Sequence, residues 1–139
     1  MNWLFWSLLS ALFAGLTAIL AKVGVTGVDS NLATAVRTSV VLVFAWSVAL
    51  ATAPTASVTT WSKRTWLFLV LSGIATGLSW LCYFRALQLG PASKVAPIDK
   101  LSVVFVLVLA ALFLREPLTL KTGIGGALIA AGAVVLALK

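Results

Sequence analysis

The sequence predicts an all-α membrane protein, a polytopic bundle of five transmembrane helices in a single domain over residues 1–139. Composition is the first reason: 62% of the residues are hydrophobic and 9% are charged, whereas an ordinary soluble domain carries roughly 25% charged residues. Lipid must therefore solvate most of the chain. Pattern is the second reason: the apolar runs are continuous and not alternating, which favours helices of about 20 residues over a barrel.

The apolar runs give five helices, separated by residues that end or begin helices. The first helix opens with Trp3 and Trp6, whose rings suit the interface between lipid and water. Because its start lacks the basic region and the cleavage site of a signal peptide, we expect this helix to be retained. Asp29 or Ser30 can cap the second helix. In chain order, the expected helices cover about residues 3–25, 32–51, 66–89, 93–114 and 118–138.

Polar and proline-containing segments bound the last three helices. A polar loop over residues 53–60 precedes the third helix, and Gly90-Pro91 separates the third helix from the fourth. The fourth helix ends at residues 115–117, Arg-Glu-Pro, and holds Pro97 in its second turn. Because proline lacks a backbone N–H, Gly90-Pro91 and residues 115–117 are expected to interrupt helical hydrogen bonding.

Small residues recur along two faces of the fifth helix. Small side chains let helices approach closely in lipid, so their abundance here predicts contact between subunits. A general preference of membrane helices for small residues is the alternative. The two faces hold Gly123, Ala127 and Ala131, and Gly126, Ala130 and Ala133.

Positive charges flank the helices equally on both sides of the membrane. An odd number of helices places Lys63, Arg64, Arg115 and Lys121 on the side of Met1, and Lys22, Arg85, Lys94 and Lys139 on the opposite side. The richer side stays cytoplasmic, so four charges against four favour neither orientation. We therefore expect dual topology and an antiparallel homodimer, which would reproduce the inverted repeats of many transporters. A parallel dimer and a pairing with a related half-chain stay open.

Several charged residues are expected inside the helices, on the side opposite Met1. Lys22 ends the first helix, Arg37 lies in the second turn of the second, and Asp99 and Lys100 lie in the first two turns of the fourth. Ionisable groups cost about 2.5–3.5 kcal/mol each at the bilayer centre and usually face water or pair with each other. We expect Asp99 to pair with Arg37 or Lys22, and the excess positive charge to line an aqueous vestibule.

Structural interpretations of these charges stay open. Arg37, Asp99 and Lys100 can form salt bridges that never contact a substrate. Side chains near helix ends can extend to the phospholipid headgroups instead of facing a cavity. The side chains near helix ends are Lys22, Arg85 and Lys94.

Trp80 and Tyr83 lie one turn apart on the third helix. We expect them either to form an aromatic wall of a pocket or to pack in the helix core.

The sequence has no histidine and one cysteine, Cys82, so we expect no metal site, no cofactor and no catalytic residues. The net charge of +7 is attributed to lipid headgroups and not to nucleic acid, since the basic residues flank or enter apolar runs. The predicted substrate-binding residues are Arg37, Asp99, Lys100, Lys22, Trp80 and Tyr83.

Two motifs resemble the EamA domain of the drug/metabolite transporter superfamily. They are Tyr-x-x-Ala-Leu-x-x-Gly-Pro-Ala over residues 83–92 and Glu-x-Leu-Thr over residues 116–119. The resemblance covers essentially the whole chain. Most such proteins hold two copies of this domain, so the resemblance implies a short five-helix type that pairs into a multi-pass transporter of the cell (inner) membrane. Residues 98–102, Ile-Asp-Lys-Leu-Ser, depart from the apolar pattern of many relatives.

These observations predict a secondary transporter of a small polar metabolite, anionic or zwitterionic, that works by alternating access as a dimer. If protons couple transport, Asp99 is the expected carrier. Two alternatives stay open. A flippase or half-subunit for a lipid-linked anion would have a side opening between helices. A non-transporting membrane subunit that scaffolds a partner would have fully paired charges and no cavity.

Overall fold

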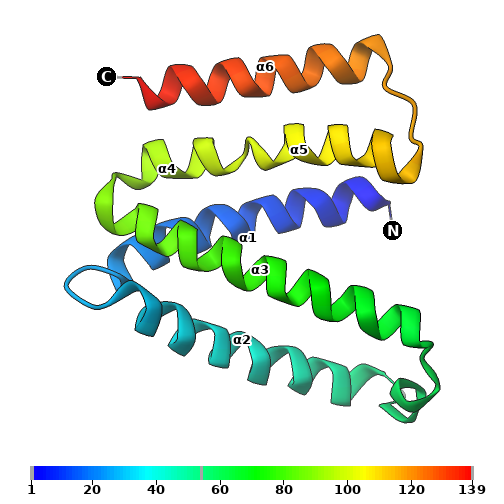
Figure 1. The fold of residues 1–139 in the computed structure, drawn as a ribbon. Coiled ribbons are helices and arrows are strands. Elements are labelled where there is room, and N and C mark those ends of the chain that lie inside the picture. Colours follow the sequence, from blue (N-terminus) through cyan, green and yellow to red (C-terminus); the bar gives the residue numbers. More distant parts are fainter. Residues whose placement is uncertain (1, 54, 139) are drawn as a thin grey trace. The chain divides into compact units, whose positions relative to one another are not determined.

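Figure 1 shows the protein as a computed structural model, which describes residues 2–53 and 55–138. Across these residues five helices are long and apolar enough to cross a membrane, and the described chain contains no strand. The predicted all-α fold with five transmembrane helices is therefore confirmed. The chain divides into two compact units, residues 23–88 and residues 1–22 together with 89–139.

The unit of residues 23–88 is a helical hairpin. Helix α2 and helix α3 run antiparallel and are joined by the short 3-10 helix η1 (Figure 1). Asp29 caps α2, because its side chain accepts hydrogen bonds from the backbone N–H groups of Asn31 and Leu32. The bounds are Ser30–Thr52 for α2, Thr55–Thr60 for η1 and Lys63–Leu89 for α3.

The sequence predicted a plain polar loop over residues 53–60, whereas the structure forms η1 over most of it. Such short 3-10 turns are common connectors because they need few hydrogen bonds. Pro54 lies outside the described residues.

The second unit contains α1 and the C-terminal helices. Helix α6 lies against both α4 and α5 (Figure 1). The bounds are Trp3–Gly24 for α1, Ala92–Asp99 for α4, Ser102–Leu109 for α5, Ala110–Leu114 for the π-helical turn η2 and Leu120–Ala137 for α6.

The fourth span differs from the single helix predicted over 93–114. It is divided into α4, α5 and η2, with an irregular turn after Asp99. At this turn the N–H groups of Lys100 and Leu101 donate to carbonyls three residues earlier, those of Pro97 and Ile98, a tighter pattern than that of the α-helix. The span ends at Arg115, which adopts a left-handed conformation with φ of 55°.

One of the two small faces of α6 packs inside the chain. Gly126 is buried, and a Cβ atom added there would lie 3.0 Å from Cδ1 of Leu107 on α5. The other, neighbouring face, with Gly123 and Ala127, is exposed. Small residues on α6 therefore serve helix packing within the chain.

Large apolar side chains are mostly exposed on the described helices. Leu120 is 82% exposed and Phe113 is 78% exposed, whereas Val25 and Leu87 are among the few that are fully buried. A soluble protein of this size would bury far more apolar surface. The exposed surface fits a chain whose helices are solvated by lipid.

Candidate functional site

The guanidinium group of Arg37 on α2 lies over aromatic rings of α3. Its Cζ is 4.2 Å from the ring centroid of Trp80 and 5.6 Å from that of Phe84. Trp80 and Phe84 share one face of α3 because they are four residues apart. A cation above an aromatic ring gains about 0.5–2 kcal/mol, more where water is excluded. Arg37 lies two turns after the start of α2, where its side chain reaches Trp80 and Phe84 on α3.

Arg37 makes no hydrogen bond to any residue that the structure describes. Its Nη1 atom is completely buried without an acceptor, while the side chain as a whole is half-buried. A buried donor without an acceptor costs roughly 1–3 kcal/mol, and more if it is charged. Asp29, the sole carboxylate among residues 23–88, is already used as the α2 cap. The aromatic contact therefore leaves the Nη1 donor of Arg37 unsatisfied.

Tyr83 is near enough to Arg37 to interact with it electrostatically. Its side chain is half-buried, like that of Trp80, one turn earlier on α3. Three of the six predicted site residues, Arg37, Trp80 and Tyr83, are thus brought together within one compact unit.

The other three predicted residues belong to the second unit. Nζ of Lys100 lies 3.3 Å from Oδ2 of Asp99, and their side chains are 56% and 35% exposed. The sequence predicted that Asp99 pairs with Arg37 or Lys22, whereas the ion pair that the structure describes joins Asp99 to its chain neighbour. This exposed pair lies at the irregular turn between α4 and α5.

Lys22 is fixed by the turn that begins the fourth span. Its Nζ donates a hydrogen bond of 2.9 Å to the backbone carbonyl of Gly90. The contact is partly buried and joins residues 68 positions apart in the chain. Lys22 therefore holds two segments of its unit together, in addition to any contact with a substrate.

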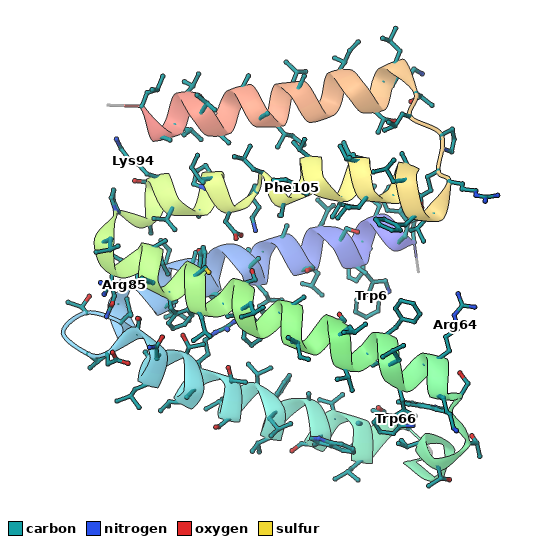
Figure 2. The ribbon with its side chains drawn as sticks, in the orientation of Figure 1. Trp6, Arg64, Trp66, Arg85, Lys94 and Phe105 are labelled. Atoms are coloured by element: carbon teal, nitrogen blue, oxygen red, sulfur yellow. The ribbon has the colours of Figure 1, made fainter. Side chains whose placement is uncertain are left out.

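Lys94 is held by hydrogen bonds within the protein, at the end of a membrane-spanning helix. Its Nζ donates to the backbone carbonyls of Ala137 and Leu138, each at 3.1 Å. Figure 2 shows Lys94 directed toward the C-terminal end of α6. A cation at the C-terminal end of a helix satisfies free carbonyls and stabilises the helix dipole. Lys94 is therefore a helix cap.

Arg85 belongs to a small polar network at the end of α3. Its Nη1 donates to Oε1 of Gln88 at 3.0 Å, and Nε2 of Gln88 donates to the carbonyl of Val28 in the turn before α2. Figure 2 places Arg85 at this end of the hairpin. The network joins the two ends of the hairpin.

Sequence reasoning missed Phe84 and Gln88. Phe84 is buried and forms the second ring near Arg37; its spacing of four residues from Trp80 could have revealed it. Gln88 is a polar residue near the end of an apolar helix, and nothing in its sequence context indicates that Val28 is its partner.

Across the described residues, five helices long and apolar enough to cross a membrane define this chain as a multi-pass membrane protein. The family model of the EamA-like transporters matches residues 1–138. The chain belongs to the EamA-like transporter family. Multi-pass proteins of this family typically reside in the inner membrane.

Two relatives agree with this assignment. A protein of Sinorhizobium sp., named an uncharacterized transporter in the cobO 3′ region, is 54% identical over 136 residues, 98% of this chain and 96% of the relative. A probable 4-amino-4-deoxy-L-arabinose-phosphoundecaprenol flippase subunit ArnE of Enterobacter sp. (strain 638) is 32% identical over 74 residues, 53% of this chain and 69% of the relative. No solved structure matches the chain.

Proposed function

We propose that this EamA-family transporter moves a small polar metabolite, anionic or zwitterionic, by alternating access. The proposed substrate-contacting residues fall in both units. Charged side chains inside apolar helices support these positions, because such groups usually serve a solute path. In one unit they are Arg37, Trp80 and Tyr83, and in the other they are Lys22, Asp99 and Lys100.

The unsatisfied guanidinium of Arg37 carries this proposal. A purely structural arginine normally has its donors bonded within the protein. Here the aromatic ring of Trp80 fixes the position of the group, and no described residue accepts from it. A charge held in position without an acceptor is suited to bind a solute that brings the acceptor.

We further propose that two copies assemble as an antiparallel homodimer. The even balance of flanking lysine and arginine supports insertion in both orientations. Two oppositely inserted copies would form the inverted repeats around which many transporters bind substrate. The Sinorhizobium relative, which is named an uncharacterized transporter, aligns with this chain over 96% of its own length.

Proteoliposomes test the transport proposal. Currents would be recorded on a solid-supported membrane with lactate, glycerol 3-phosphate and alanine as probes for a carboxylate, a phosphate ester and a zwitterion. We expect flux for at least one probe, and a loss of about tenfold or more in Arg37→Ala and Asp99→Asn, equivalent to about 1.4 kcal/mol. Arg64→Ala and Glu116→Gln serve as matched controls and should keep the flux.

Two outcomes contradict the proposal. The first is an absence of flux for all three probes. The second is unchanged flux in both Arg37→Ala and Asp99→Asn, which would remove the assigned residues while leaving the transporter class.

A flippase subunit is the second candidate, favoured by the similarity to the ArnE relative. In that case the solute would be a lipid whose headgroup is anionic, and the same positive side chains would contact the headgroup. The same proteoliposomes can carry a fluorescent phosphatidylglycerol, whose transfer between leaflets is followed by quenching with dithionite. Lipid transfer without soluble flux would favour the flippase, and neither activity would favour a scaffold subunit.

A further inference from the structure

We propose that Arg37 is the oxyanion-recognition residue of this protein, so that the group bound is a carboxylate or phosphate of the solute. The inference rests on the proposed transport function and narrows its substrate class. Three features of the chain support it. The guanidinium is held over an aromatic ring, its Nη1 donor has no acceptor, and the chain has only three acidic residues.

The guanidinium of Arg37 is held over the face of the Trp80 ring and not by a hydrogen bond. At 4.2 Å from the ring centroid, the group is held by cation–π attraction, which needs no N–H donor. The N–H groups of arginine point outward in the plane of the group. That planar fork matches two oxygens of one carboxylate or phosphate, and it suits a halide or an uncharged carbonyl less well.

The donors of Arg37 need an acceptor that the surrounding unit does not supply. No hydrogen bond joins Arg37 to a described residue, and Nη1 is fully buried without a partner. The residue as a whole is half-buried, so part of Arg37 remains accessible. Because the cation–π contact uses no N–H donor, an oxyanion that reaches the guanidinium can supply the missing acceptor and leave the aromatic contact in place.

The chain has too few carboxylates to neutralise its basic residues, and two of the three carboxylates already have partners. The sequence has three acidic and ten basic residues. Asp29 accepts two backbone N–H groups at the start of α2, and Asp99 pairs with Lys100. Glu116 follows Arg115 directly in the sequence, at the end of the fourth span. The compensating negative charge for Arg37 is therefore expected from outside the chain.

Arginine side-chain NMR tests this inference without any transport measurement. The chain would be labelled with ¹⁵N-arginine and placed in nanodiscs of uncharged phosphatidylcholine. The Nε–Hε resonance of Arg37 would be assigned by its loss in Arg37→Lys. Sodium phosphate and sodium acetate would then be titrated against sodium chloride at constant ionic strength.

Arg64 is the matched control within the same chain. Its guanidinium also lies over a ring, 5.8 Å from the centroid of Phe68, but at the exposed start of α3 (Figure 2). We expect a saturable shift for Arg37 with phosphate or acetate and a small, linear shift for Arg64. In Trp80→Leu, the concentration for half-saturation of Arg37 should rise about tenfold, because the guanidinium loses its fixed position.

A second set of nanodiscs containing phosphatidylglycerol distinguishes a soluble oxyanion from a lipid phosphate. If the Arg37 resonance is already shifted in these nanodiscs, and soluble phosphate adds nothing, the inference holds with the headgroup as its source. If Arg37 shifts no more than Arg64 in every titration and in both lipids, the inference is overturned.

Failure of this inference and failure of the transport proposal give different results. Flux that is lost in Arg37→Ala, without any oxyanion-dependent shift, overturns the inference and keeps the transport role of Arg37. A saturable shift together with unchanged flux in Arg37→Ala supports the inference and removes Arg37 from the transport path.

Discussion

Lys22 donates a hydrogen bond to the carbonyl of Gly90, so that the last turn of α1 is joined to the turn before α4. Gly90 lies between α3 and α4 and belongs to neither helix. A lysine at this position therefore has a structural task within its unit, whether or not it also contacts a solute.

Replacing Lys22 by alanine should destabilise the protein. Hydrogen bonds to charged groups contribute about 1.5–3 kcal/mol, and a partly buried one lies in this range. Unfolding by sodium dodecyl sulfate in mixed micelles, followed by tryptophan fluorescence, measures the loss. Lys121→Ala, an exposed lysine at the start of α6, is the control; an equal loss in both variants would refute the role given to the Gly90 contact.

Removing the cap formed by Lys94 should loosen the end of α6. In Lys94→Met the carbonyls of Ala137 and Leu138 lose their donor, and a cation at a helix C-terminus contributes about 0.3–1 kcal/mol. Hydrogen–deuterium exchange should accelerate in the last turn of α6 and stay unchanged in α2. Unaltered exchange at that turn would show that Lys94 is not a cap.

The two small faces of α6 should respond differently to a large side chain. Gly126→Leu places atoms against Leu107, whereas Gly123→Leu meets no atom within 4 Å of its Cβ. We expect a loss of about 1–3 kcal/mol for overpacking at Gly126 and none at Gly123. Leu107→Ala should partly restore Gly126→Leu. Equal stability of the two leucine variants would contradict the packing described between α5 and α6.

Dual topology predicts that the orientation shifts when two flanking charges are removed from one side of the membrane. Two C-terminal reporters would be used, each active on only one side of the membrane. Both should give a signal, because each orientation is populated. Removing two charges in Lys63→Ala with Arg64→Ala should shift the chains toward one orientation, since lysine and arginine set orientation. A C-terminus found on one side alone, in both forms, would argue against the antiparallel homodimer.

The helices could be predicted closely from the sequence because their causes are local. An apolar run in lipid has to satisfy its own backbone groups, and the helix does so within each run. Asp29 or Ser30 was predicted as the cap from its place before the second run, and in the structure the cap is Asp29. The fourth span was less well predicted, since its irregular turn at Lys100 depends on how a proline-containing helix adjusts its hydrogen bonds.

The candidate site was predictable in part. A charge within an apolar run marks Arg37 by sequence alone, because its burial is costly. That Trp80 and Phe84 would hold its guanidinium depends on the rotation of α2 against α3, which no local pattern specifies. For the same reason Lys94 was open to two interpretations until the carbonyls of Ala137 and Leu138 were seen beside it.

Composition and continuous apolar runs by themselves determined that this chain lives in the membrane and crosses it with five helices, and two sequence motifs carried its resemblance to the EamA-like transporters. Tertiary structure alone decided which charged side chains find partners: Lys94 a helix end, Lys22 a turn carbonyl, and Arg37 a ring without an acceptor. Solvation by lipid acts on each segment separately, whereas a hydrogen-bond partner is set by distances between segments far apart in the chain.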